Sequence, residues 1–275
     1  MSNISLHVGC DTVDPDQYGG FRGGAGGSDQ DAASMQELAI SHGFESSQPI
    51  TYRDATPENV LSWLESAEER TVPGDTLLLT YSGHGFSITP DEGIPGPQPA
   101  WALYDRLLLD LELFSAFDRL PGRRIVVVTD CCYEGFHALN LGRKNSTIHR
   151  YIDRDGGDAN YQMRREFFNN IIKSSMNYAG PNTRADIVGL AACADTEEAG
   201  ADDDGGYFTI ALLKQMAHPV SILNYETLIE NVRNILRPQH QTPQLLQHGA
   251  GAPLIVESTP FYPVPGSAPE SLEIR

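Results

Sequence analysis

The sequence lacks the features of several large protein classes. Its 275 residues include only four cysteines, which are too few and too irregularly spaced for the disulfide framework of a secreted domain. No apolar run approaches the roughly 18 residues that span a bilayer, and the first ten residues hold neither a basic segment nor a long apolar one. We therefore expect a soluble protein of a reducing compartment, the cytoplasm, with no membrane partner.

Basic residues are also scarce. Nineteen Lys and Arg stand against 37 Asp and Glu, which makes the formal net charge −18. An acidic surface repels phosphate backbones and anionic lipid, so nucleic acid is not an expected partner. The same surface attracts peptides and proteins that carry basic residues, although charge that only keeps a protein soluble is the simpler explanation.

What the sequence does contain is two apolar runs that end in reactive side chains. The run at 125–129 is followed three residues later by Cys132, and the run at 75–81 is followed by His84 and Gly85. In an α/β sheet the carboxyl ends of parallel strands form the functional edge. A thiolate nucleophile needs a proton donor for its leaving group. We predict Cys132 as nucleophile and His84 as general acid/base, with the Gly85 and Cys132 N–H groups as oxyanion donors.

Strand-like and helix-like patterns alternate along the first half of the chain. Strands are expected at 4–10, 49–52, 75–81 and 125–129, and helices at 28–43, 56–69 and 110–120. The second half adds helices at 161–178, 207–216 and 225–236 and strands at 186–193 and 241–246. This order predicts an α/β fold whose central sheet has about six mostly parallel strands and helices on both faces.

Two kinds of ligand site are disfavoured by spacing. The glycine-rich stretch at 11–27 has neither a Lys-Ser/Thr ending nor a G-x-G-x-x-G register, so we do not expect nucleotide binding. Cys131, Cys132 and His84 could suggest zinc, but they show no C-x₂-C or H-E-x-x-H spacing.

The residues around His84 and Cys132 resemble a known family. TYSGHG at 80–85 and DCCYEG at 130–135 are similar to the two active-site motifs of the metacaspases and orthocaspases, which are caspase-like cysteine peptidases. The 48-residue separation is close to the roughly 50 residues of caspase-type sites. The resemblance covers roughly residues 4–250 and implies a caspase-haemoglobinase-like three-layer fold in which Cys132, rather than Cys131, is the nucleophile.

The resemblance also implies a domain organisation. We expect one caspase-like peptidase domain over 1–256, with a large-subunit-like part at about 1–135, a basic linker-like insertion at about 136–185 and a small-subunit-like part at about 186–256. A Pro-rich tail would follow at 257–275.

Members of this family cleave after Arg or Lys, and the resemblance places four residues around the pocket for that side chain: Asp31, Asp130, Ser82 and Ser28. Two carboxylates facing one guanidinium form a strong charge pair. The alternative is that Asp31 caps the first helix and Asp130 merely ends a strand.

The linker-like insertion is the least acidic part of the chain. It holds eight of the 19 basic residues between 136 and 184, so an enzyme with Arg/Lys specificity could cleave itself there. The candidate positions for this autoprocessing are Arg143, Lys144, Arg154, Arg164 and Arg165. A separate activator protein is the other expected route of regulation.

The sequence departs from the family at Tyr133 and Glu134, where His and Ser commonly follow the nucleophile. A catalytically silent, caspase-like interaction module that regulates a partner protein is therefore the alternative function. No cofactor is required by the sequence. Some relatives use calcium, but the acidic residues for it cannot be matched here, and the acidic loop at 195–204 lacks an EF-hand pattern.

Overall fold

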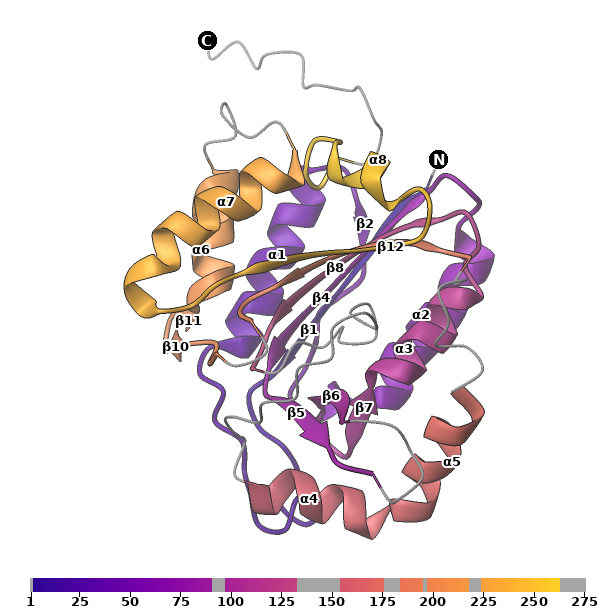
Figure 1. Cartoon of the computed structure of the whole chain (residues 1–275), viewed down its shortest axis with the longest axis vertical. Coiled ribbons are helices and arrows are strands. Elements are labelled where there is room, and N and C mark those ends of the chain that lie inside the picture. Colours follow the sequence, from indigo (N-terminus) through magenta and orange to yellow (C-terminus); the bar gives the residue numbers. More distant parts are fainter. Residues whose placement is uncertain are drawn as a thin grey trace.

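The computed structural model describes residues 2–90, 97–132, 154–175, 184–194, 197–217 and 224–262. Its central sheet has seven strands, drawn in Figure 1, with the order β12-β9-β8-β4-β1-β2 and with β3 also pairing with β1. The strands are β1 (Asn3–Cys10), β2 (Glu45–Ser46), β3 (Ile50–Thr51), β4 (Thr76–Gly83), β8 (Arg124–Asp130), β9 (Asp186–Ala191) and β12 (Gln244–His248). All pairs are parallel except β12 with β9.

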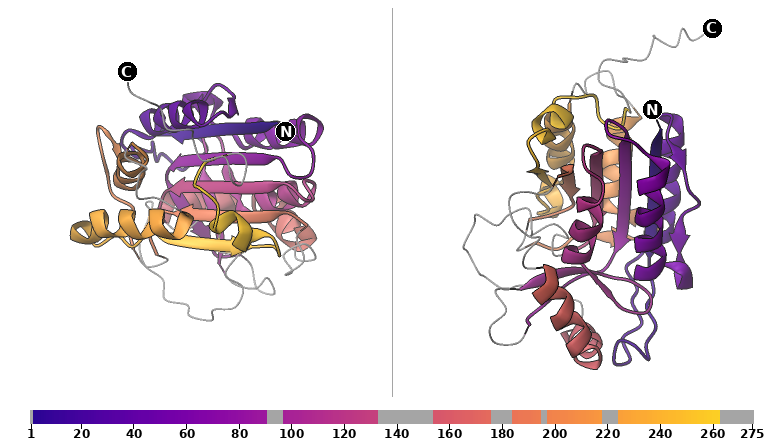
Figure 2. Two further views of the ribbon diagram at one scale, coloured as in Figure 1. Left: turned by 90° about the horizontal axis from the view of Figure 1, so that it is seen from above. Right: turned by 90° about the vertical axis from the view of Figure 1, so that its right-hand side faces the viewer.

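Two helical layers enclose this sheet, as Figures 1 and 2 show. One face packs against α2 (Pro57–Arg70) and α3 (Asp110–Asp118), while α5 (Arg165–Ser175) packs against α3 and α4 (Arg154–Met163) lies against the shorter strands near the end of this layer. The other packs against α1 (Ser28–Ser41), α6 (Tyr207–Met216), α7 (Tyr225–Leu236) and α8 (Ala252–Val256). The predicted three-layer arrangement, with a mostly parallel sheet and helices on both faces, is confirmed.

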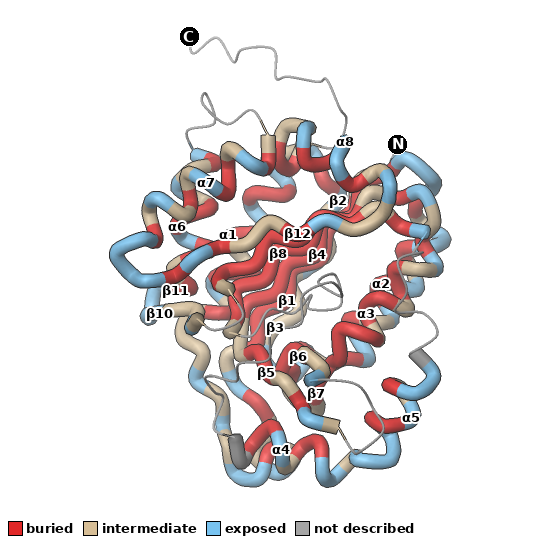
Figure 3. The backbone as a smooth tube through the Cα atoms, in the orientation of Figure 1, coloured by how far each residue is buried: buried red, intermediate tan, exposed pale blue. Residues whose placement is uncertain are grey.

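The central strands are apolar along almost their whole length because both of their faces are covered. Residues Thr76–Ser82 of β4 and Ile125–Asp130 of β8 are all buried, which Figure 3 shows as a continuous buried stripe. A parallel sheet between two helical layers requires this pattern. The first helix of the α2–α3 layer begins where the sequence predicts, because the Thr56 hydroxyl accepts a hydrogen bond from the Asn59 N–H and Pro57 occupies the first turn.

A second sheet lies between β4 and α3, where the sequence analysis predicts no strand. It consists of β5 (Gly85–Ile88), β6 (Gln98–Ala102) and β7 (Leu107–Leu109), all antiparallel. The Gly- and Pro-rich composition between 89 and 99 hid these short strands from sequence reasoning. Burial stabilises them: Trp101 is fully buried and stacks on Tyr81 with ring centroids 4.5 Å apart.

Three further boundaries differ from expectation. The single helix expected at 161–178 is two helices, because the chain turns at Arg164 between α4 and α5. The last strand begins at Gln244 rather than at 241. Residues beyond 257 are not all tail, because Phe261 is buried and its N–H donates to the Tyr225 hydroxyl (3.0 Å).

The remaining short elements are the hairpin β10 (Ala201–Asp202) and β11 (Gly205–Gly206) and the 3₁₀ turns at Tyr52–Asp54 and Arg237–Gln239. Among the described residues, none of the helices combines the length and the apolar character that crossing a membrane requires.

Candidate active site

The site begins with the register of two neighbouring strands. β4 and β8 run parallel, and Ser82 is paired with Asp130. His84 and Cys132 each lie two residues beyond that pair. The sheet therefore places the imidazole and the thiol at equivalent positions on adjacent strand ends, as the sequence predicts.

His84 is held by its backbone and has an unused ring nitrogen. Its carbonyl accepts hydrogen bonds from the Tyr81 hydroxyl (2.7 Å) and from the Ala102 N–H (2.9 Å), so the β5–β6 sheet fixes its position. Its ring packs edge-on against Phe21, and its Nε2 has no hydrogen-bond partner within the described part of the chain. Burial lowers the pKa of His84, and the charge of Asp11 opposes this. The imidazole is thus neutral at rest and able to accept a proton.

Cys132 contacts the backbone of a different segment. The Ala199 N–H donates to its Sγ over 3.3 Å, and the Ala199 carbonyl lies 3.7 Å from the same sulfur. Burial raises the pKa of the Cys132 thiol, the negative charges of Glu198 and Asp130 raise it further, and the Ala199 N–H lowers it. The neighbouring Cys131 is buried in the core on the α2–α3 face, so the two adjacent thiols lie on opposite sides of the strand end.

Two buried carboxylates lie near one another at this edge of the sheet, and one of them, Asp130, acts on the charge of the Cys132 thiol; we call Asp31, Ser82 and Asp130 the acidic cluster. Asp31 accepts hydrogen bonds from the Ser82 hydroxyl (2.6 Å) and from the Gly206 N–H (2.9 Å). Asp130 accepts two, from the Thr209 N–H and hydroxyl, both at 2.8 Å. Burial raises the pKa of Asp31 to about 7, with a further contribution from the Asp130 charge, and burial raises the pKa of Asp130 to about 6. Burial therefore disfavours the ionised form of both carboxylates.

Neither structural alternative for the two acids, a helix cap for Asp31 or a simple strand end for Asp130, describes their contacts. Asp31 does not cap α1, since no side chain caps that helix and its carboxylate bonds Ser82 and Gly206 instead. Asp130 does more than end its strand: it accepts hydrogen bonds in the first turn of α6, where a carboxylate stabilises a helix. The acidic cluster therefore joins α1, β4, β8 and α6.

Glycines and a small hydroxyl shape the same region. A Cβ on Gly206 would lie 2.1 Å from Asp130 Oδ2, and one on Gly205 would lie 2.4 Å from Asp31 Oδ1, so only glycine lets this backbone approach both acids. Ser28, one helical turn before Asp31, is buried, and its Oγ has no hydrogen-bond partner among the described residues. The four predicted pocket residues are thus brought into one region, with one polar atom unsatisfied.

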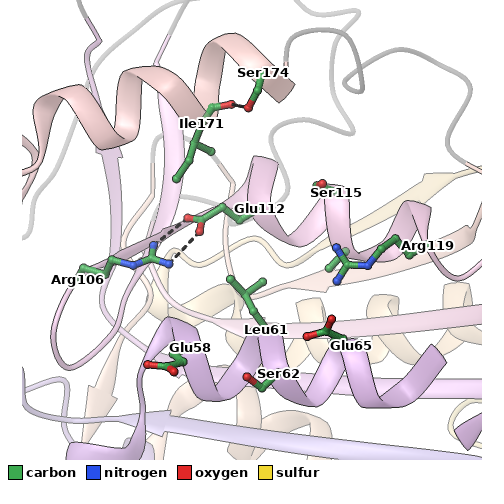
Figure 4. Close-up of a pocket in the computed structure, with 11 residues that line it drawn as sticks. Glu58, Leu61, Ser62, Glu65, Arg106, Glu112, Ser115, Arg119, Ile171 and Ser174 are labelled. Atoms are coloured by element: carbon green, nitrogen blue, oxygen red, sulfur yellow. Dashed lines mark hydrogen bonds and ion pairs between the residues drawn. The ribbon is translucent and has the colours of Figure 1, made fainter. Parts of the chain in front are cut away.

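Other hollows lie outside this region. Figure 4 shows a cavity of about 520 Å³ between α2, α3 and α5, where Arg106 forms an ion pair with Glu112 (2.9 Å). A second, of about 410 Å³, is lined by residues of α7 and by Glu197, Gln241 and Thr242. Within the described ranges, no three or more His, Cys, Asp or Glu side chains are grouped so that they could hold a metal ion. The described part of the chain therefore shows no cluster of ligands for calcium or zinc.

Several residues singled out in the sequence lie outside the described part of the structure. Arg143, Lys144, Tyr133 and Glu134 lie outside the described residues, as does the side chain of Arg154. Arg164 lies between α4 and α5, where its guanidinium donates to the Gln17 side chain, and Arg165 is exposed at the first position of α5.

Sequence reasoning missed three contributors to the site: Ala199, Thr209 and Gln241. No local pattern marks them, because each acts through a backbone group or a hydrogen bond to a distant segment. Two of them lie in stretches that resemble the family: AACADTEEA at 191–199 contains Ala199, and GYFTIALL at 206–213 contains Thr209.

Comparisons with known proteins agree with this geometry. A family model described as the Caspase domain matches residues 13–254. Metacaspase-1 of Lodderomyces elongisporus is 23% identical over 78% of this chain, and Metacaspase-3 of Trypanosoma cruzi is 27% identical over 77%. The chain covers 59% of each of these curated relatives, so it spans less than two thirds of their length.

Solved structures show the same fold. Protein GSU0716 of Geobacter sulfurreducens superposes with a TM-score of 0.82 at 25% identity, covering 96% of this chain and 100% of that chain. Caspase-1 of Spodoptera frugiperda superposes with a TM-score of 0.53 at 13% identity, covering 90% of this chain and 88% of that one, which is a likeness of fold alone.

Proposed function

This chain belongs to the caspase-domain family of peptidases, and from that premise we propose that it is a cysteine endopeptidase with a His84–Cys132 dyad that cleaves after Arg or Lys. The observation that carries the proposal is the register of β4 and β8, which sets His84 and Cys132 at equivalent strand ends beside two buried carboxylates.

The proposed reaction uses the residues as follows. The Cys132 thiol gives its proton to the imidazole of His84, and the thiolate attacks the carbonyl carbon of the scissile peptide. The N–H groups of Gly85 and Cys132 hold the resulting oxyanion. His84 then protonates the leaving amine, which leaves an acyl-enzyme on Cys132. Water, deprotonated by His84, hydrolyses this thioester and restores the thiol.

The electrostatics of the resting site suit this sequence of steps. The raised pKa of Cys132 and the lowered pKa of His84 both favour a neutral thiol beside a neutral imidazole. Proton transfer between them would therefore accompany substrate binding rather than precede it. The same shifts predict that kcat/KM rises from acidic towards mildly alkaline pH.

The acidic cluster supports a basic residue before the cleaved bond. Burial raises the pKa values of Asp31 and Asp130, and the charge of Asp130 raises that of Asp31 further, so a nearby cation would favour their ionised forms. An incoming guanidinium or ammonium would supply such a cation, and Ser28 Oγ offers a further acceptor. The net charge of −18 favours encounter with basic segments.

We also propose autoprocessing, and two of its candidate cleavage positions are less favourable than the others. Arg165 lies inside a helix, and Arg164 is tied to Gln17 at the junction of two helices, so either site would have to unfold before it could be cleaved. We therefore favour Arg143 and Lys144, which lie outside the described residues, over the helical positions. Mass spectrometry of active enzyme after long incubation tests this, and a single intact mass would remove it.

The central experiment is hydrolysis of fluorogenic peptides that end in Arg, Lys, Asp or Ala, with and without calcium. Cys132→Ala and His84→Ala should abolish cleavage after Arg and Lys. Cys131→Ala is the matched control, because it removes the adjacent thiol from the other side of the strand end and should retain activity.

Equal activity in the Cys132→Ala variant would disprove the nucleophile assignment. Cleavage after Asp or Ala as fast as after Arg would disprove the pocket assignment. No cleavage of any peptide in either condition would favour the alternative function, an interaction module without catalysis.

A further inference from the structure

The segment Glu197–Gly200 touches the candidate nucleophile, although it lies more than sixty positions further along the chain. Its contact with Cys132 is a backbone contact: the Ala199 N–H points at Sγ from 3.3 Å. Ala199 is only partly buried and has a methyl side chain, so its own packing cannot fix the direction of that N–H. Something else must hold the segment against the sulfur.

Two side-chain anchors on either side of Ala199 do this. The Glu197 carboxylate accepts from the Thr242 N–H (2.6 Å) and hydroxyl (2.7 Å). The buried Gln241 side chain accepts from the Gly200 N–H (3.1 Å) and donates to the Ala192 carbonyl (2.9 Å). Gln241 and Thr242, which lie shortly before β12, thus hold the residue immediately after Ala199 and the residue two positions before it.

We infer that Gln241 and Glu197 are positioning residues: by holding the Ala199 N–H against Cys132 Sγ, they stabilise the thiolate and keep the nucleophile reactive. This inference rests on the proposed role of Cys132 and assigns a role to residues that do not themselves touch the sulfur.

The surroundings of the sulfur explain why such a donor matters. Asp130, from the same strand, and Glu198, from the Ala199 segment, both place negative charge near Cys132, and burial also disfavours the thiolate. His84 on the adjacent strand end is neutral at rest, because burial lowers its pKa. The Ala199 N–H is therefore the group that opposes all three effects, and a hydrogen bond to a charged acceptor is among the stronger ones in proteins.

The test is the pH dependence of alkylation of Cys132 by iodoacetamide in the folded protein, with peptide mapping to separate it from the three buried cysteines. Gln241→Met keeps the side-chain volume and removes both hydrogen bonds. We expect its alkylation rate at neutral pH to fall about tenfold, with the profile displaced to higher pH. Gln247→Met, an exposed glutamine on the same strand segment, is the matched control and should leave the profile unchanged.

Glu197→Ala separates positioning from electrostatics. Removing a negative charge near the site would by itself make the thiol ionise more readily, so a profile displaced to higher pH can only come from the lost anchor. Should Gln241→Met fold poorly, Thr242→Val gives the same test in milder form, because Thr242 is exposed and only its hydroxyl bond to Glu197 is lost.

Reduced thermal stability of the Gln241 and Glu197 variants with an unmoved alkylation profile would overturn the inference, because it would leave them a structural role only. The readout needs no substrate, so it is independent of peptide hydrolysis. A displaced profile in a chain that cleaves no peptide would support the inference and refute the proposed function, and an unmoved profile in an active peptidase would do the reverse.

Discussion

Two buried polar clusters lie on the same face of the sheet, one around Thr80 and the other around Ser82 of β4. They differ in the ionisable groups that they contain. The inner cluster is Ser5, His7 and Thr80, in which both ring nitrogens of His7 have partners: Thr80 Oγ1 at 2.9 Å and Ser5 Oγ at 3.0 Å. The outer one is the acidic cluster, whose two carboxylates accept hydrogen bonds but have no ion-pair partner among the described residues. The inner cluster is neutral and fully hydrogen-bonded, whereas burial disfavours the ionised form of the carboxylates in the outer one.

The pKa shifts of the two clusters differ in the same way. Burial lowers the pKa of His7 to about 3, so this fully buried ring stays neutral and needs only hydrogen bonds. Burial raises the pKa of Asp31 to about 7, which means that its ionised form is costly until a positive charge arrives. A buried group that is neutral and fully hydrogen-bonded indicates a structural role, whereas buried carboxylates with raised pKa values at strand ends indicate a binding site.

The largest expected effect is on activity, from the outer cluster. Asp31→Asn should lower kcat/KM for Arg peptides by about 10²–10³-fold, because one partner of a buried charge pair is lost. At pH 8 the variant should also be more stable than wild type, by about 1–3 kcal/mol, because it lacks a carboxylate whose ionised form is disfavoured by burial. Steady-state kinetics and urea denaturation measure the two.

Glu37→Gln, which removes an exposed acid from the same helix, is the control and should change neither quantity. A similar loss of activity towards Ala peptides would show that Asp31 supports the fold of the site rather than recognition of a basic side chain.

The inner cluster should respond in the opposite way. His7→Leu leaves the Ser5 and Thr80 hydroxyls buried without a partner and should cost about 2–4 kcal/mol of unfolding free energy. At a temperature where the variant is folded, its kcat/KM should stay within about twofold of wild type. Adding Thr80→Val should recover part of the stability in urea titrations. A large loss of kcat/KM in folded His7→Leu would break the distinction between the clusters.

The pH dependence of stability should separate the clusters by sign. The lowered pKa of His7 means that the unfolded chain takes up a proton first, so its contribution is present above pH 6.5 and is lost as the pH falls towards about 3. The raised pKa values of Asp31 and Asp130 act inversely: their contribution to stability is fully present below the usual carboxyl pKa of 3.8 and is lost as the pH rises to about 6 to 7.

Melting temperatures measured from pH 4 to pH 9 check this. His7→Leu should remove a contribution that rises with pH between about 3 and 6.5, and Asp31→Asn should remove one that falls with pH between 3.8 and about 7. Identical profiles for both variants and wild type would show that these groups have ordinary pKa values.

The smallest effect is expected from Ser28. Ser28→Ala should leave the melting temperature nearly unchanged, because its Oγ bonds no described residue, and should lower kcat/KM for basic peptides by about two- to tenfold. Ser34→Ala on the same helix is the control. A clear loss of stability with unchanged kinetics would show that the Ser28 hydroxyl serves the fold.

Much of the fold was predictable because long apolar runs and capped helices are local signals. β1, β4, β8 and helices α1, α2, α6 and α7 lie within a few residues of their expected positions. The β5–β7 sheet was not predictable, since strands of three to five residues around a Gly- and Pro-rich segment are stabilised by the burial of Trp101 and its neighbours rather than by their own pattern.

For the site, the sequence by itself determined which residue types stand at the strand ends. The order of His84 and Cys132 and the presence of Asp31 and Asp130 follow from short motifs, because a motif is a local property of the chain. The tertiary structure alone decided what those residues meet: that Asp130 supports α6, that Asp31 bonds Ser82 rather than capping its helix, and that Ala199 contacts the sulfur. These contacts join segments 51 to 79 residues apart, and only the packing of the sheet between its two helical layers brings such segments together.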